Sequence, residues 1–106
     1  MTSRTKALSI TEKVRREVYE RDSYDGAPCC AACGKPHNLS LHHIVPRSLS
    51  GLGIPRNLVV LCAECHDIAD HGKPGERWVI RSHIEEIMKT QYPGWSESQL
   101  RYKREI

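Results

Sequence analysis

Two pairs of cysteines, each with a two-residue gap, constrain this chain more than any other feature. Cys30 and Cys33 form the first pair, and Cys62 and Cys65 form the second. Thiolates are strong zinc ligands, and two such pairs complete one tetrahedral site. A site of this kind ties together two distant parts of the chain. The sequence therefore predicts a fold that is braced by a structural Zn²⁺ on these four sulfurs.

The segment between the two cysteine pairs is unusually long. It holds 28 residues, more than a compact zinc ribbon needs. It contains the adjacent histidines His42 and His43 and also Asn57, and His66 directly follows the second cysteine pair. We therefore expect the zinc to serve as a brace and the insert to carry the function. Cys29 is an alternative ligand to its neighbour in the first pair, but the two-residue gap favours the neighbour.

The size and the cysteine count bound the class of protein. A chain of 106 residues predicts one domain, and its six aromatic residues with no Phe predict a thin core that bound metal would reinforce. No apolar stretch resembles a signal peptide or is long enough to cross a membrane. We expect a cytoplasmic protein whose thiols bind metal rather than form disulfides.

The charge is unevenly distributed along the chain. Residues 1–21 hold six Lys or Arg against three Glu, and residues 98–106 hold three against one, whereas residues 22–97 have a net charge of −2. Basic ends around a slightly acidic centre suit a metal-dependent site that acts on a nucleic-acid backbone. Basic ends that are simply solvated would give the same pattern, so charge alone does not decide between the two.

Hydrophobic spacing and capping residues predict the first half of the secondary structure. Residues 1–8 are expected to be a disordered lead. A capping pair, Ser9 and Glu12, precedes apolar residues at every fourth position, which predicts a helix over residues 10–21. The stretch that follows, residues 22–28, is expected to be a loop because it is rich in Asp, Gly and Pro.

The second half predicts two strands followed by helices. Strands are expected over residues 39–45 and 58–61, and a helix over residues 62–71 is ended by Gly and Pro. Two further helices are expected, the first capped by Ser82 and the second, a basic terminal helix, starting at Ser96.

This order of strand, loop, strand and helix, with a histidine pair on the first strand and a histidine at the start of the helix, resembles the HNH endonuclease family. The matching stretch runs from about Val14 to His71. The resemblance implies an α+β fold: a ββα-metal finger braced by a structural zinc, with flanking helices. It also implies one nuclease domain over residues 9–106, with a core at about 14–71 and C-terminal helices at about 76–106. The implied activity is divalent-metal-dependent cleavage of DNA.

The resemblance also assigns roles to individual residues. His43 corresponds to the general base that activates water, and His42 to a ligand of the catalytic metal. Most members have Asp at that ligand position, but the nuclease colicins carry a histidine pair there. His66 corresponds to the second ligand, and Asn57 to the residue that ties the loop and orients the base. The catalytic ion is expected to be Mg²⁺, Mn²⁺, Ni²⁺, Co²⁺ or Zn²⁺.

Elementary chemistry supports this division of labour. Hydrolysis of a phosphodiester needs a deprotonated water and a cation on the phosphate. Adjacent strand residues point to opposite faces, so His42 and His43 have different jobs, and a neutral imidazole is a suitable base. Asp70 lies one helical turn after His66 and is a candidate third ligand. Arg47 and Arg56 flank the loop and are candidate phosphate contacts, with solvated loop positions as the alternative.

Other residues and other functions have to be weighed against this interpretation. Trp78 and Trp95 are expected to be core anchors rather than base-stacking platforms, and His37 and His83 are expected at the surface. The main rival is a non-catalytic zinc-ribbon module that binds nucleic acid. A purely structural zinc protein would leave the basic ends unexplained. Chains of this size resemble phage and bacterial mobile-element proteins, which suggests partners in packaging, restriction or mobility.

Overall fold

A computed structural model describes residues 2–103 of the chain, and its centre is a small antiparallel sheet. The sheet consists of β3 (Leu39–His43) and β4 (Leu58–Cys62), and α3 (Ala63–His71) follows β4 without a loop. This β3–β4–α3 unit confirms the predicted α+β class and the ββα arrangement. The first strand ends at its second histidine, two residues earlier than expected.

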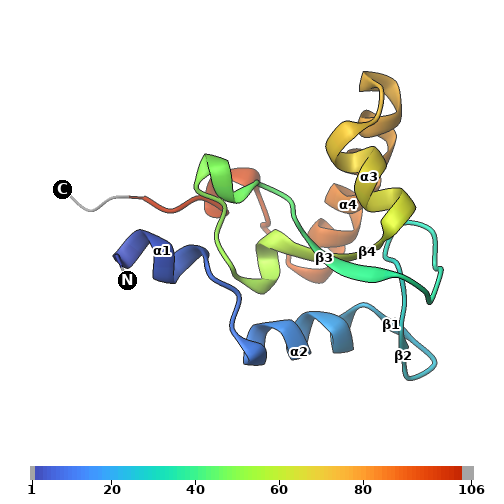
Figure 1. Cartoon of the computed structure of the whole chain (residues 1–106), viewed down its shortest axis with the longest axis horizontal. Coiled ribbons are helices and arrows are strands. Elements are labelled where there is room, and N and C mark those ends of the chain that lie inside the picture. Colours follow the sequence, from blue (N-terminus) through green and yellow to red (C-terminus); the bar gives the residue numbers. More distant parts are fainter. Residues whose placement is uncertain (1, 104–106) are drawn as a thin grey trace.

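Helices cover both faces of this sheet. In Figure 1, α2 (Glu12–Arg21) runs along one side, and α3 lies with α4 (Pro74–Gln91) on the other. The side chains of β4 alternate accordingly: Val59 packs with the residues of α4, whereas Leu58 packs with α2. Every residue of β4 is buried, because both faces of the strand are covered. That is why β4 has an uninterrupted apolar sequence instead of an alternating one.

The C-terminal end of the approach helix α2 is fixed to β4 by hydrogen bonds of Arg21 and Asp22. Thr11 caps the helix by accepting a hydrogen bond from a backbone N–H, so the helix starts slightly later than the capping pair at Ser9 predicted. At its other end, Asp22 accepts a hydrogen bond from the Val60 N–H at 2.9 Å, and Arg21 binds Asp22 at 2.8 Å. These contacts hold the sheet in a fixed position against α2.

The last third contains one long helix, not the two that were predicted. α4 begins at Pro74, far before Ser82, which lies inside the helix. A proline that ends one helix is also well suited to the first turn of the next. Residues Glu97–Gln99 form only a short 3₁₀ turn. The prediction of a terminal helix from Ser96 is therefore wrong up to residue 103, and residues 104–106 lie outside the described residues. Leu100, which directly follows this turn, is fully buried.

The prediction of a disordered lead is also wrong for the described part of residues 1–8. Ser3–Leu8 form α1, which Thr2 caps by accepting a hydrogen bond from a backbone N–H at 3.1 Å. Leu8 is 2% exposed, and the carbonyl of Ala7 accepts a hydrogen bond from the Gly53 N–H. The few apolar residues of this polar stretch give no periodic signal, so only the tertiary contacts show that this segment is ordered.

One smaller difference from the prediction concerns local structure. The expected loop at 22–28 contains a short hairpin of β1 (Ser23–Tyr24) and β2 (Ala27–Pro28), because Asp25 and Gly26 both take the positive φ values of a tight turn. Trp95 is buried as predicted, and its indole N–H donates to the Arg56 carbonyl. Within the described residues, no helix is both long and apolar enough to span a membrane.

Trp78 is not a core anchor. It lies on the outer surface of α4 and is 68% exposed, so the prediction for this residue is wrong. Its position in the sequence placed it before the expected start of the helix, and the face it would occupy was therefore not predictable. His37 and His83 are exposed, as predicted.

Candidate functional site

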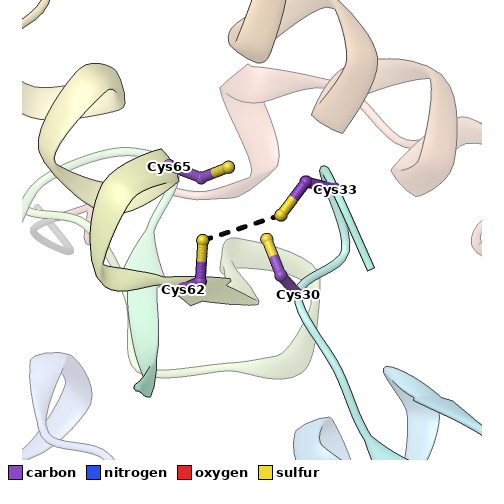
Figure 2. Close-up of side chains that lie close together, drawn as sticks. All are labelled: Cys30, Cys33, Cys62 and Cys65. Carbon is purple, nitrogen blue, oxygen red and sulfur yellow. Dashed lines mark hydrogen bonds between the residues drawn. The ribbon is translucent and has the colours of Figure 1, made fainter. Parts of the chain in front are cut away.

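The four predicted zinc ligands come together in one cluster. Their sulfurs lie within 4.8 Å of one another, and Figure 2 shows them converging on a common point between the first cysteine loop and the start of α3. Cys30, Cys62 and Cys65 are buried, and only Cys33 is exposed. Cys29 is free and lies outside the cluster.

The first cysteine pair is shaped by a turn that ends at Gly34. This residue has a φ of 82°, which glycine adopts without strain, and its N–H donates to the Cys30 carbonyl at 2.8 Å. The second pair lies at the junction of β4 and α3, since Cys62 is the last strand residue and Cys65 lies in the first helical turn. The cluster therefore joins the first loop to the β4–α3 junction.

The surroundings shift the pKa values of the clustered thiols in different directions. Burial acts to raise the pKa of Cys30, but backbone N–H groups, including that of Cys62, lower it to about 7. Burial raises the pKa values of Cys33 and Cys65, and neighbouring thiols contribute to both. Four thiolates in one small space repel one another unless a metal ion neutralises them. Four sulfur donors with no gap for a substrate match a closed structural zinc site.

A second donor cluster lies further along α3. His42 on β3 and both His66 and Asp70 on α3 offer ligand atoms within 4.8 Å of one another. Nε2 of His66 lies 3.3 Å from Asp70 Oδ2, and Nδ1 of His42 lies 3.7 Å from Oδ1 of the same carboxylate. Two imidazoles and one carboxylate are a suitable donor set for a divalent transition metal. The structure thus places the two predicted ligands and the candidate third ligand together.

Ser40 is a part of this cluster that the sequence did not reveal. Its hydroxyl lies 2.8 Å from Nδ1 of His66, which leaves Nε2 free to face Asp70. A second hydrogen bond of this kind fixes the ring orientation of a metal-binding histidine. Ser40 and His42 are two residues apart on β3 and so share one face of the strand, which is the signal that could have identified it.

The two adjacent histidines lie on opposite faces of the strand, as expected. His42 pairs with Val59 and is 9% exposed; burial, reinforced by nearby positive groups and opposed by Asp70, lowers its pKa to about 4. His43 pairs with Leu58 on the other face. Burial and the charge of Arg47 lower the pKa of His43. Both imidazoles are therefore held in the neutral form that metal binding and proton acceptance require.

The two histidines nevertheless meet in one pocket at the end of the strand. A pocket of about 170 Å³ is lined by both of them and by Asp70. One ring nitrogen of His43, Nε2, is buried and has no hydrogen-bond partner among the described residues. The pocket therefore combines a candidate base with candidate metal ligands and is open to solvent on one side.

Asn57 ties together the loop between the strands. It is fully buried, and its side-chain oxygen accepts a hydrogen bond from the Val45 N–H at 2.8 Å. Its amide group donates to the carbonyls of Val45 and Leu52. The backbone carbonyl of Asn57 also accepts from the Ile44 N–H, directly after the histidine pair. Asn57 does not touch either histidine ring through a hydrogen bond, so any effect on the base passes through the backbone.

The two predicted phosphate contacts, Arg47 and Arg56, differ in whether their guanidinium groups already bind other residues of the protein. Arg47 is exposed and close enough to His43 to lower its pKa. The guanidinium of Arg56, in contrast, donates to Gln99 at 3.1 Å and lies over the ring of Tyr92 at 5.0 Å. Arg47 therefore remains available to a ligand, whereas Arg56 is already engaged within the fold.

Comparisons with known proteins bear on the same region. Residues 30–72 match the family model described as HNH endonuclease. A solved structure of the Type IV phosphorothioation-dependent restriction endonuclease ScoMcrA is similar, with 19% identity and a TM-score of 0.49. That similarity covers 83% of this chain and 23% of the restriction enzyme, so the chain spans only about a quarter of its length. No curated protein matches the chain.

Proposed function

We propose, from the premise that residues 30–72 form an HNH endonuclease segment, that this protein is a divalent-metal-dependent endonuclease that hydrolyses DNA phosphodiester bonds. The observation that carries the proposal is the convergence of His42, His66 and Asp70. Two of them, His42 and Asp70, also line a solvent-accessible pocket together with His43. A structural brace alone gives no reason to have a second donor set.

The donor set decides how a catalytic ion would be held. His42 and His66 are the proposed ligands, Asp70 is the proposed third ligand, and Ser40 keeps the His66 ring in position. A divalent ion, when bound there, polarises the phosphate and neutralises developing charge. Nitrogen donors favour Ni²⁺, Co²⁺ and Zn²⁺ in affinity, while the carboxylate also accommodates Mg²⁺ or Mn²⁺.

His43 is the proposed general base. Its lowered pKa keeps the imidazole neutral at neutral pH, so the ring can accept a proton from the attacking water. Asn57 fixes the backbone on the C-terminal side of His43 through the loop hydrogen bonds, and in this way it positions the base. Arg47 is the proposed phosphate contact, because its charge lies close to His43 and its exposed guanidinium is free to form a fork with two phosphate oxygens.

The cysteine cluster is proposed to hold a structural Zn²⁺. It joins the first loop to α3, and α3 carries two of the three proposed catalytic ligands. Closing this cluster therefore stabilises the helix that positions the active site. The rival function, a non-catalytic module that binds nucleic acid, requires the same zinc but gives no role to the second cluster.

A plasmid-nicking assay separates the two functions. Wild-type protein with added divalent metal should convert supercoiled plasmid to nicked or linear forms. His43→Ala should lose roughly 10²–10⁴-fold of this rate, the usual contribution of a general base. His83→Ala removes an exposed histidine from α4 and serves as the matched control, because it should keep the full rate.

The same variants should separate catalysis from binding. DNA affinity comes mainly from Lys and Arg contacts to phosphate, so His43→Ala should bind DNA almost as tightly as the wild type. If His43→Ala nicks plasmid at the wild-type rate while its metal is bound, the proposed mechanism is wrong. If no metal supports cleavage by the wild type but DNA is bound, the non-catalytic module is the better description.

A further inference from the structure

Two arginines on α4 form a wall of the active-site pocket, and the mechanism above gives them no role. Arg77 and Arg81 line the pocket that His42, His43 and Asp70 also line. They are four residues apart, so their side chains lie one above the other on the same face of the helix. The pocket is therefore lined both by candidate metal ligands and by two arginines.

These two positive charges have no partner among the described residues. Both side chains are exposed, and within residues 2–103 neither forms an ion pair or a side-chain hydrogen bond. Two like charges one helical turn apart repel each other. An anion bound between them would relieve this repulsion.

A second hollow continues from the first one along α4. It has a volume of about 210 Å³ and is lined by Pro74, Arg77, Trp78 and Arg81. The two arginines thus border both hollows, and Trp78, which is 68% exposed, borders the outer one. Arg56, in contrast, is not free, because its guanidinium donates a hydrogen bond to Gln99 and lies over the ring of Tyr92. Free positive charge therefore extends over α4 at Arg77 and Arg81, in addition to Arg47 beside His43.

We propose that Arg77 and Arg81 bind a backbone phosphate of the DNA strand next to the phosphodiester that is cleaved. This inference rests on the proposed function and says where the DNA strand next to the cleaved bond is bound. The arginines face the outer hollow as well as the inner one, so the phosphate they take is a neighbour of the reacting one, which lies at the metal ligands. They are accordingly binding residues, and the forked geometry of guanidinium suits two phosphate oxygens at once.

The test is the salt dependence of DNA binding. Kd is measured by fluorescence anisotropy with a labelled duplex at several salt concentrations, using protein as purified with no chelator and no added divalent metal. The plot of log K against log salt has a negative slope, and each lost phosphate contact makes it less steep by about 0.9. Arg77→Gln and Arg81→Gln should each weaken binding roughly tenfold, and the double variant should lose the contact to this phosphate altogether, with the full change in slope.

Two further variants control for charge and geometry. Lys89→Gln removes one positive charge from an exposed position on the same helix that borders neither hollow, and it should leave the slope unchanged. Arg81→Lys keeps the charge but loses the fork, so it should recover the slope and only part of the affinity. All substituted residues are exposed, and zinc content with circular dichroism verifies that the fold is kept.

The outcomes are distinct for the two proposals. In cleavage assays the double variant should raise KM and leave kcat at saturating DNA unchanged. A double variant with the same Kd and slope as Lys89→Gln overturns the inference, as does a large loss of kcat without a change in Kd. Arginine-dependent binding by a wild-type protein that never cleaves DNA would overturn the proposed function and leave the phosphate contact standing.

Discussion

The cysteine cluster and the histidine–aspartate cluster both take ligands from α3, but they are built for different purposes. The first has four sulfurs, three of them on buried residues, and it lies where the helix begins. The second has two nitrogens and one carboxylate, and it opens into a pocket one turn later. Cys65 and His66 are neighbours in sequence and belong to different clusters. One short helix thus carries a closed site and an open site side by side.

This difference teaches how a thin core can still position a reactive site. A closed four-sulfur site leaves no coordination position for a substrate, so its binding energy goes into folding. A three-ligand site keeps positions free, but it needs ligands that are already held in place. In the proposed function the closed site fixes the start of α3, and the hydrogen bond from the Val60 N–H to Asp22 fixes β4 from the other face.

The largest difference between the clusters should appear when one ligand of each is removed. Cys62→Ser should unfold or aggregate the protein, because structural zinc contributes roughly 10–16 kcal/mol and a domain is stable by only about 5–15 kcal/mol. His66→Ala should keep its fold, since its site adds little to folding. Circular dichroism and zinc content of the two purified variants check this, and a folded Cys62→Ser protein without zinc would contradict the assignment.

The second expected effect is on activity and belongs to the open site alone. His66→Ala should retain one zinc per chain but lose roughly 10²-fold or more of its cleavage rate, because a metal ion supplies several kcal/mol of transition-state stabilisation. His71→Ala is the matched control: this histidine is exposed on the same helix and is not part of the donor cluster. Equal rates for His66→Ala and the wild type with every metal would remove His66 from the proposed ligands.

The parts of the fold that the sequence predicted are those with a strong local signal. The cysteine spacing and the histidine pair led to the ββα unit through the resemblance to the HNH family, and the apolar repeat of α2 led to that helix. The alternation of side chains along a strand was enough to place His42 and His43 on opposite faces. These signals arise within a few residues of each other, so a single sequence is enough to show them.

The parts that were missed depend on contacts between distant segments. α1 is ordered by Leu8 and by the loop around Gly53, far along the chain. Pro74 signals the end of one helix in the sequence, although it is also the start of the next, and this double role hides the face that carries Arg77 and Arg81. Arg56, for which the sequence left phosphate contact and a solvated loop position open, instead donates a hydrogen bond to Gln99, which no local pattern reveals.

A third prediction concerns the choice of metal at the open site. Asp70→Asn removes the one charged oxygen donor, so cleavage with Mg²⁺ or Mn²⁺ should fall about tenfold or more, while cleavage with Ni²⁺ or Co²⁺ should fall less. Asp67→Asn removes a neighbouring exposed carboxylate from the same helix and should change neither. Rates measured across the four metals test this, and an equal loss with all of them would mean that Asp70 does not set the selectivity.

The smallest expected effect is a shift in pH dependence, which has no counterpart at the closed site. Burial and the charge of Arg47 lower the pKa of His43, so the acid limb of kcat/KM should lie below the ordinary imidazole value of about 6.5. Arg47→Ala removes one of these two causes. The pKa of His43 should then rise, and the acid limb should move to higher pH.

Arg47→Lys keeps the positive charge and is the matched control, because it should leave the limb in place even though it loses the guanidinium fork. Protonation of the metal ligands affects all three proteins alike, so their comparison isolates the base. An acid limb that does not move in Arg47→Ala would mean that His43 is not the group that titrates.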